Sequence, residues 1–443
     1  MVSRMTGAER LVYRGTGLVH YVEVLVLPGR LMATPALPMS SDERLRRTAL
    51  VHGAFTPNAP VNRLDMFAGR GPQIDRVFEA VFSPGQHAAI YGERGVGKTS
   101  LANIIYDVVV AAGQHNFVPA RVNCSRGITF TEIWREIFKQ LPISRGDDTF
   151  HLDDQIADNP NSEEIRGLLE QLDNPAILVI DEFDRVDQIT ATQMADTIKT
   201  ISDRAIPATL VIVGVAQTLD DLIEEHASVV RALVQVEMQR MSFDELLEAI
   251  KNGLKIADMS MPEHIRFRIA TLSQGLPHNT HLLAKHAALT AVKDGRTEVS
   301  ESDYRNAIRE ALADKAQSLG KVYQQAVYSP KKNIFAQVLL ACALAADESG
   351  IFSAKDVRDP LRRITKGSYE IQAYITHLDK FSQSRGPVLR KGGMKRRFQY
   401  KFAEPLMQPY VLMKGLSDGL ITEEQLNVPP SPTEQRHLFQ ASP

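Results

Sequence analysis

The stretch Gly92-Glu93-Arg94-Gly95-Val96-Gly97-Lys98-Thr99 decides the fold of this chain. It fits the pattern G-x-x-x-x-G-K-S/T, and it lies between a short apolar segment, residues 87–91, and a helix-like segment, residues 99–112. Glycines let such a loop bend until successive backbone N–H groups point at phosphate oxygens, an approach that a Cβ atom would block. The sequence therefore predicts a phosphate-binding loop between a buried strand and a helix.

The residues of this loop and the serine after it are candidate ligands of a nucleotide. They are Gly92, Glu93, Arg94, Gly95, Val96, Gly97, Lys98, Thr99 and Ser100. Lys98 is expected to reach the β- and γ-phosphates, and Thr99 is expected to bind Mg²⁺. The N-terminus of the following helix adds partial positive charge. The cofactors predicted from this stretch are ATP and Mg²⁺.

A second motif follows another apolar segment. Residues 176–180 form a buried-strand candidate, and Asp181 and Glu182 come directly after it. Ligands of parallel sheets bind at the carboxyl ends of the strands. Asp181 is expected to hold Mg²⁺ through water, and Glu182 is expected to polarise the attacking water as a general base. Together the two motifs predict ATP hydrolysis.

Apolar segments alternate with helical segments through the first half of the chain. The expected strands are residues 87–91, 117–124, 176–180, 209–213 and 234–238. This alternation predicts an α/β domain with a parallel five-stranded sheet that helices cover on both faces. After Met241 no further strand is expected until the basic C-terminal segment. Ser242-Phe243-Asp244-Glu245 fits a capping box, so a helical lid is expected to begin there.

These patterns give five expected segments. They are a poorly structured N-terminal extension over residues 1–55, a nucleotide-binding α/β domain over 56–241, a helical lid over 242–328, a further domain over 329–425 and a disordered tail over 426–443. Met39 is followed by a new polar start, so the first 38 residues are interpreted as an upstream extension or the result of a misplaced start codon.

Composition and charge narrow the class of protein. The chain has 443 residues, of which 44% are hydrophobic and 23% charged, so it is neither a disulfide-rich peptide nor a disordered polymer. The formal net charge is only −2, yet residues 331–402 contain 15 Lys and Arg against 6 Asp and Glu. An acidic body with one basic segment favours contact with a polyanion through that segment.

The sequence gives no sign of secretion, metal-binding cysteines or a membrane span. Cys124 and Cys342 fit neither a disulfide framework nor a zinc site. The longest apolar run, residues 338–346, is about half of what a membrane-spanning helix needs. A cytoplasmic protein without membrane contact is therefore expected.

Several motifs taken in order resemble those of the AAA+ ATPases. They are Phe67-Ala68-Gly69-Arg70, the glycine loop, Asp181-Glu182, Gly214-Val215-Ala216-Gln217 and the segment from His226 to Arg231. The resemblance covers about residues 60–325, and it is closest to the origin-recognition or initiator-like branch and to the neighbouring STAND signalling ATPases. It implies a phosphate-loop fold with a helical lid.

The resemblance also implies roles for individual residues. Phe67, Gly69 and Arg70 would help to form the adenine pocket. Gln217 occupies the family's sensor-1 position and would orient the attacking water, although it also suits an ordinary surface loop. Arg231 lies where members of the family place an arginine finger acting on a neighbouring subunit of an oligomer, and a surface ion pair is the alternative.

The lid departs from the pattern of many AAA+ members. Gly275-Leu276-Pro277-His278 resembles the glycine-x-proline turn of STAND proteins, and Pro277 and His278 would therefore face the nucleotide. His278 stands where many members have a sensor-2 arginine. A mostly neutral imidazole near pH 7 supplies less positive charge than a guanidinium. We therefore expect low turnover, as in a switch.

The basic C-terminal segment resembles a winged-helix domain, which initiator-like AAA+ proteins carry at this end. Helices are expected over residues 333–345, 353–364 and 368–381, followed by a hairpin over residues 388–402 with Gly392-Gly393 at its turn. In the returning strand Phe398, Tyr400 and Phe402 are expected on the core face. The candidate contacts with double-stranded DNA are Gln372, Thr376 and Lys380, with His377, on the third helix and Arg390, Lys391, Lys395, Arg396 and Arg397 on the wing.

Two functions stay open at this point. The first is a DNA-associated ATPase switch, in which the nucleotide state controls the conformation or assembly of the protein. The second is a STAND-like signalling or defence ATPase, whose basic module binds a protein or RNA partner. No aromatic pore-loop motif supports a remodelling motor.

Overall fold

The structure is a computed structural model of the 443-residue chain. It describes residues 39–114, 116–145, 148–216, 218–223, 227–331, 333–394 and 397–426. The predicted tail lies almost entirely outside these ranges, and so does the extension up to residue 38.

Five parallel strands form the central sheet. In sheet order they are β2 (Val118–Asn123), β5 (Ala176–Asp181), β6 (Ala208–Val215), β1 (His87–Gly92) and β7 (Leu233–Glu237). Every neighbouring pair is parallel, so the predicted parallel five-stranded sheet is confirmed. Strands β1 and β5, which precede the two motifs, flank β6. Their carboxyl ends meet at one edge of the sheet, which brings the glycine loop close to the two carboxylates.

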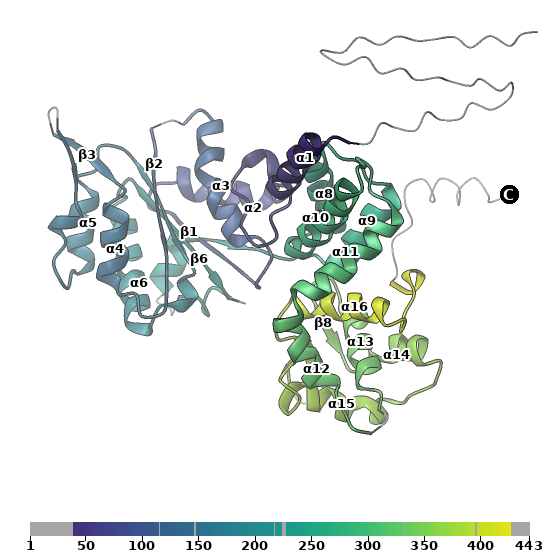
Figure 1. Ribbon diagram of the computed structural model, residues 1–443. Helices are drawn as coiled ribbons and strands as arrows, with labels where there is room; N and C mark the ends of the chain where they lie inside the picture. Colours follow the sequence, from purple (N-terminus) through teal and green to yellow (C-terminus); the bar gives the residue numbers. More distant parts are fainter. Residues whose placement is uncertain are drawn as a thin grey trace, which may run out of the picture. The chain divides into compact units, whose positions relative to one another are not determined.

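Helices cover both faces of the sheet (Figure 1). One face carries α2 (Gly71–Phe82) and α3 (Lys98–Ala111), and the other carries α4 (Phe130–Phe138), α5 (Ser162–Leu169) and α6 (Gln188–Asp203). Side chains of β1 alternate between the two apolar cores: Ala88 and Ile90 face α2 and α3, whereas Ala89 and Tyr91 face the other core. This alternation is the period of two that a strand buried on both faces imposes.

Three short elements of this region were not predicted from the sequence. They are the strands β3 (Pro142–Arg145) and β4 (Asp148–His151) and the helix α7 (Ala227–Ala232). The two strands pair in antiparallel fashion apart from the main sheet. Strands of four residues are too short to produce a readable alternation of apolar and polar side chains.

Along the chain, the last strand of the sheet is followed by helices, as expected. They are α8 (Phe243–Ala257), α9 (Glu263–Ser273), α10 (Pro277–Lys293), α11 (Glu301–Asp314) and α12 (Lys321–Val327). The predicted capping box is present: the Ser242 hydroxyl accepts from the backbone N–H of Glu245, and the Glu245 carboxylate accepts from that of Ser242. The helices α8 to α11 make up the lid.

One expectation about the N-terminal segment is wrong. Residues 41–54, assigned to a poorly structured extension, form the helix α1 (Ser41–Ala54), which packs against α8 and α10 of the lid. Arg47 pairs with Glu43 on its own helix and with Asp258 of the lid. The helix is largely polar, so its few apolar residues did not show a clear period in the sequence. Its last turn leads to Phe55, which is 1% exposed.

The C-terminal elements form a separate group around a small antiparallel sheet. They are α13 (Phe335–Ala345), β8 (Ile351–Ser353), α14 (Arg358–Thr365), α15 (Ile371–Gln383), β9 (Leu389–Gly392), β10 (Gln399–Phe402) and α16 (Met407–Ser417). The predicted hairpin is confirmed by the pairing of β9 with β10, and β8 adds an unpredicted third strand. The apolar run 338–346 lies mostly in α13, and within the described ranges no helix is long and apolar enough to cross a membrane.

The side chains of the returning strand follow the expected pattern only in part. Tyr400 and Phe402 are buried, as predicted, but Phe398 is 38% exposed. Phe398 precedes β10, so the strand's alternation does not extend to it. Its ring instead lies under the ammonium of Lys391, 4.1 Å from the ring centroid.

We expect Phe55→Ala to destabilise the lid. The Phe55 ring packs edge-on against His281 of α10, with 5.9 Å between the ring centroids, and lies against Gly253 of α8. Removal of a buried phenylalanine costs about 3–5 kcal/mol of unfolding free energy. Leu45→Ala is the control, because Leu45 is 72% exposed on α1 and should change stability by no more than about 0.5 kcal/mol. Urea unfolding of both variants tests this; equal, small effects would show that α1 and Phe55 do not support the lid.

Candidate nucleotide-binding site

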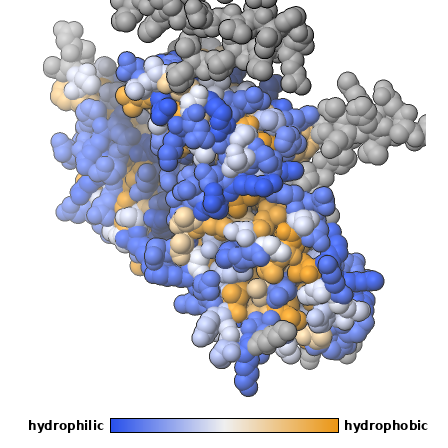
Figure 2. Space-filling view, turned by 45° about the vertical axis from the view of Figure 1, so that its right-hand side comes forward, coloured by the Kyte–Doolittle hydropathy of each residue, from blue (hydrophilic) through white to orange (hydrophobic). Residues whose placement is uncertain are grey.

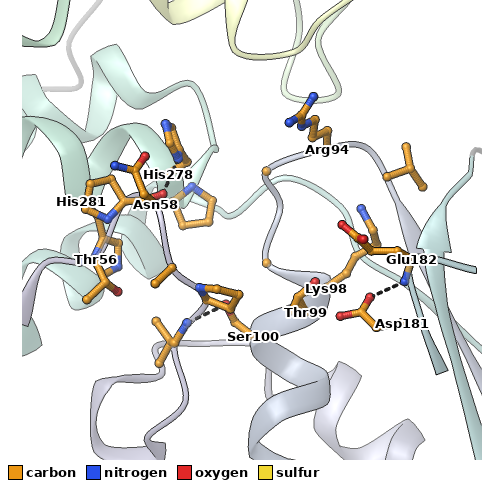
Figure 3. Close-up of a pocket in the computed structure, with 18 of the residues that line it drawn as sticks. Thr56, Asn58, Arg94, Lys98, Thr99, Ser100, Asp181, Glu182, His278 and His281 are labelled. Atoms are coloured by element: carbon orange, nitrogen blue, oxygen red, sulfur yellow. Dashed lines mark hydrogen bonds between the residues drawn. The ribbon is translucent and has the colours of Figure 1, made fainter. Parts of the chain in front are cut away.

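A pocket of about 500 Å³ lies at the edge of the sheet where the glycine loop and the two carboxylates meet (Figure 3). Five parts of the chain line it: residues 56–61, the loop with the start of α3, the end of β5 with the turn after it, the end of β6, and the start of α10. The pocket is therefore bounded by the α/β domain on one side and by the lid on the other.

The loop has the backbone conformation that its glycines allow. Gly95 and Gly97 have φ angles of 88° and 98°, in the left-handed region that favours glycine. Gly97 is the N-cap of α3 and provides no side-chain cap. The first N–H groups of α3 are thus without a capping side chain, which is the arrangement that binds an anion.

Lys98 is held within the loop itself. Its Nζ donates to the backbone carbonyls of Gly92, at 3.0 Å, and Glu93, at 2.8 Å. Burial lowers the pKa of Lys98 from 10.5 to about 8, and nearby Asp184 and Asp181 partly oppose this shift. A buried ammonium with only neutral carbonyl partners gains from the approach of an anion, and phosphate oxygens supply that charge.

Asp181 and Glu182 lie side by side at the end of β5 but have different surroundings. Asp181 is buried; one of its carboxylate oxygens accepts from the backbone N–H of Glu182 at 2.8 Å, and the other pairs with Arg121 of β2. Glu182 is 44% exposed by its side chain, and Arg185 pairs with its carboxylate at 2.9 Å. Its φ of 56° is rare for a residue other than glycine and turns the chain sharply after the strand. Both side chains line the pocket.

The residues present fit a bound Mg²⁺. The Thr99 hydroxyl and the Asp181 carboxylate line the same pocket and are hard oxygen donors, the type that Mg²⁺ prefers. Mg²⁺ usually keeps several waters and binds through one or two protein oxygens together with phosphates. Two protein oxygen donors next to a phosphate loop are consistent with that mode of binding.

Residues 56–61 form the wall that sequence analysis missed. The backbone N–H of Val61 donates to Ser100 Oγ at 3.1 Å, and its carbonyl accepts from Asn103 at 3.2 Å, so this segment is fixed to α3. Thr56 N–H donates to His281 Nδ1 at 3.2 Å, which fixes it to α10 as well. One segment thus joins the phosphate loop's helix to the lid (Figure 3). No residue type in Thr56-Pro57-Asn58-Ala59-Pro60 has a specific chemistry that would have identified it.

Two lid histidines belong to this wall and are uncharged at neutral pH. Burial lowers the pKa values of both His278 and His281 from 6.5 to about 4. His278 Nδ1 lies within hydrogen-bond distance of the Pro57 carbonyl, so the neutral ring donates there. His278 and Pro277 both line the pocket, where the sequence placed them. His281 also lines the pocket, and sequence analysis missed it.

The structure does not bring every predicted ligand to the pocket. Phe67, Gly69 and Arg70 do not line it: Phe67 packs against the core beside α2 and α3, and buried Arg70 donates to the Val96 carbonyl at 3.0 Å. Residues 56–61 line the pocket instead. Gly92, Glu93 and Val96 do not line it either: Val96 is buried, and Glu93 lines another cavity.

Of the two remaining predicted catalytic residues, the structure describes one. Arg231 is exposed on α7 and does not line the pocket. Gln217 lies outside the described residues.

The residues predicted to contact nucleic acid lie on α15 and on the hairpin formed by β9 and β10. Gln372, Thr376 and Lys380 are exposed and lie four residues apart on one face of α15. Arg397 is exposed before β10, and Lys391 pairs with Asp379 of α15 at 2.7 Å. His377 is half-buried, and its ring contacts Phe335.

Arg390 has a different position. It lines a second cavity, of about 410 Å³, together with Glu93 and Arg94 of the loop. Lys395 and Arg396 lie outside the described residues.

A comparison with protein families gives a match to the part of the chain that contains the glycine loop and Asp181-Glu182. Residues 66–213 match the family model described as AAA ATPase domain. This chain therefore contains an AAA ATPase domain. No curated protein matches the chain significantly.

Solved structures similar to this chain include proteins of Pyrococcus abyssi and Aeropyrum pernix. The Walker-type ATPase PABY2304 of Pyrococcus abyssi has 16% identity and a TM-score of 0.48, covering 80% of this chain and 98% of its own. The ORC2 protein of Aeropyrum pernix, solved as ADPNP and ADP complexes, has 16% identity and a TM-score of 0.47, covering 88% and 98%. The ORC1 protein of Aeropyrum pernix, solved in complex with DNA, has 15% identity and a TM-score of 0.45, covering 85% and 98%.

We expect Lys98→Ala to remove nucleotide binding. The variant loses the only cation that the loop buries among the described residues, and a charge-assisted contact with phosphate is worth enough to weaken ADP binding about 100-fold or more. Isothermal titration calorimetry with ADP measures the change. Lys199→Ala on α6 is the control, because Lys199 is exposed and lies away from the pocket. Equal ADP affinity in both variants would overturn the assignment of the phosphate site.

Proposed function

We propose that this protein is a slowly hydrolysing ATPase switch that associates with double-stranded DNA through its C-terminal module, residues 329–425. The observation that carries the nucleotide part is the convergence of Lys98, Thr99, Asp181 and Glu182 on one pocket that the lid helps to close. The nucleotide state would control the conformation or assembly of the protein, and Mg²⁺ would accompany ATP.

The phosphates bind at the loop end of the pocket. Backbone N–H groups at the start of α3 and the Lys98 ammonium hold the phosphate oxygens, and Lys98 leaves the Gly92 and Glu93 carbonyls to do so. Thr99, and Asp181 through water, would hold Mg²⁺, which would neutralise charge that develops on the phosphates. The base then lies toward residues 56–61 and α10, the opposite wall of the pocket.

Glu182 acts as the general base in this proposal. Its carboxylate lines the pocket and takes the proton of the attacking water. Arg185 holds one of the two oxygens of this carboxylate in an ion pair. Neutral His278 supplies no cation to the γ-phosphate. Both features support low turnover.

Arg231 is proposed to act on the nucleotide of a neighbouring subunit. It is exposed and remote from the pocket of its own chain, so it can serve as a finger only in an oligomer. Such a residue stabilises charge on the transferred phosphoryl group.

Glu182→Gln is expected to keep nucleotide binding and to lose hydrolysis. The amide retains the size of the side chain but cannot accept the proton, so turnover should fall by about 10²–10⁴-fold. A phosphate-release assay combined with an ADP titration measures both properties. Glu79→Gln, an exposed glutamate on α2, is the control. Normal turnover in Glu182→Gln would remove Glu182 from its proposed role.

The C-terminal module supports contact with DNA. This module contains three helices, α13, α14 and α15, and a three-stranded sheet, which are the elements of a winged helix. The exposed face of α15 carries Gln372, Thr376 and Lys380, side chains that suit base edges and phosphates. Residues 331–402 contain 15 Lys and Arg against 6 Asp and Glu, which favours a polyanion.

A protein or RNA partner, as in a STAND-like signalling or defence ATPase, is the second candidate. Figure 2 shows apolar side chains gathered on the lower half of the visible surface, where the C-terminal elements lie. Exposed apolar surface of this kind is found where proteins associate.

Fluorescence anisotropy of a labelled duplex distinguishes these functions. The protein should bind the duplex with a log–log salt slope of roughly −5 if about six phosphates are contacted. The Lys380→Glu/Arg397→Glu double variant should bind at least about 10-fold more weakly. Lys251→Glu is the control, since Lys251 is an exposed cation on α8 of the lid.

The titration is repeated with ADP, a non-hydrolysable ATP analogue or no nucleotide. Absence of binding in all three states, from protein that binds ADP, would refute the DNA function and favour the protein or RNA partner.

A further inference from the structure

A short segment of the C-terminal module, Glu404-Pro405-Leu406-Met407-Gln408, lies directly against the phosphate loop. Glu404 pairs with Arg94 of the loop at 3.5 Å. Leu406 packs against the apolar core beneath the loop, and a Cβ atom on Gly95 would lie 3.6 Å from Leu406 Cδ2. Residues of the segment thus contact the loop that is proposed to bind phosphate.

Arg240 fixes the far end of this segment. Its side chain is 6% exposed and pairs with the Glu93 carboxylate of the loop. Nη1 of Arg240 also donates to Gln408 Oε1 at 2.6 Å and to the Gln274 carbonyl of the lid at 3.2 Å. Gln408, which is fully buried, donates in turn to Gln274 Oε1 at 2.7 Å and to the Ala343 carbonyl at 3.1 Å. The loop, the lid and the C-terminal module therefore meet at one buried guanidinium.

Arg94 is only weakly bound in the contact between the phosphate loop and the segment 404–408. It lines the nucleotide pocket and also the second cavity, of about 410 Å³, between the loop and the module. Its side chain is 71% exposed, and its single contact with Glu404 is long, so this pair contributes little in water. The triphosphate of a nucleotide carries several negative charges and is the stronger partner for a guanidinium.

Glu404 depends on Arg94. One of its carboxylate oxygens is buried without a hydrogen-bond partner among the described residues, and the other pairs with Arg94. Departure of Arg94 toward a phosphate would leave a half-buried carboxylate without its cation. An unpaired carboxylate is more stable in water, so the segment is then favoured to leave the loop.

The second cavity shows what the segment's departure would uncover. Arg390 of β9 and Lys401 of β10 are register partners and line this cavity opposite Glu93 and Asp221. Burial lowers the pKa of Lys401, and the charge of Glu93 partly opposes that shift. Arg390 is nevertheless exposed, whereas Lys401 is partly buried, so Lys401 is the one of these two cations to which phosphates of a nucleic acid have limited access in this structure.

We infer that nucleotide binding draws Arg94 away from Glu404 and thereby releases the segment 404–408 from the phosphate loop, which uncovers Lys401. Arg240 is the pivot that stays connected to the loop through Glu93. This inference rests on the proposed nucleotide site and deepens it, because it names the contact through which the nucleotide state reaches the C-terminal module.

Glu404→Gln tests the competition for Arg94. Because Glu404 and the nucleotide compete for the same guanidinium, removal of the carboxylate charge should tighten ADP binding about 2- to 5-fold. Glu404 does not line the nucleotide pocket, so a merely structural role would leave the affinity unchanged or weaken it. Glu424→Gln, an exposed glutamate in the same module, should have wild-type affinity.

Hydrogen exchange tests the release itself. In the wild-type protein, ADP should speed the exchange of amides in residues 403–408 by about 5-fold or more, whereas Glu404→Gln, which has no carboxylate to leave unpaired, should exchange equally slowly with and without ADP. Slow exchange with and without ADP in the wild type, or unchanged affinity of Glu404→Gln, would overturn the inference. Failure of the wild type to bind ADP at all would instead refute the nucleotide site, so the two failures can be told apart.

Discussion

The rest of this structure depends on how the buried ammonium of Lys98 is bound: its hydrogen bonds go to carbonyl groups and not to an anion. Lys98 donates to two carbonyls of its own loop, and burial lowers its pKa to about 8. Such a group is satisfied but not neutralised, so the loop is prepared for an anion before one arrives. The strand order brings Asp181 and Glu182 to the same edge, where they could place a metal ion and a water molecule beside that anion.

The elements around the loop form two further connections. Residues 56–61 connect α3 to α10 by backbone hydrogen bonds, so movement of the lid relative to the loop acts on the wall of the pocket. Arg240 connects the loop to the lid turn and to Gln408 of α16. Both connections start within a few residues of the phosphate site. A change of charge at that site can therefore reach the lid and the C-terminal module through short physical paths.

The sequence predicted those parts of the molecule that depend on local pattern. Strands β1, β5 and β6 are runs of buried, mainly apolar residues, so their positions follow from the hydrophobic pattern of the sequence. The glycine loop and Asp181-Glu182 were recognisable because their chemistry requires particular residue types. Helix α1 was missed because its stability comes from packing on α8 and α10 rather than from its own apolar stripe.

The wall of the pocket could not be predicted for a similar reason. Residues 56–61 contribute mainly backbone groups and small side chains, so no residue type identifies them. Phe67 and Arg70 do have distinctive side chains, yet the fold directs Phe67 into the core and Arg70 to the Val96 carbonyl. Likewise, Arg390 has the charge expected of a DNA contact, but only the register of β9 with β10 shows that it faces the second cavity.

A structure of the protein with bound ADP and Mg²⁺ tests the central claim most directly. The account predicts phosphates against the N–H groups of residues 95–99, Lys98 Nζ moved from the Gly92 and Glu93 carbonyls to a phosphate, and the base beside residues 56–61. A base bound beside Phe67 and Arg70, or Lys98 still bound to its two carbonyls with nucleotide present, would contradict it.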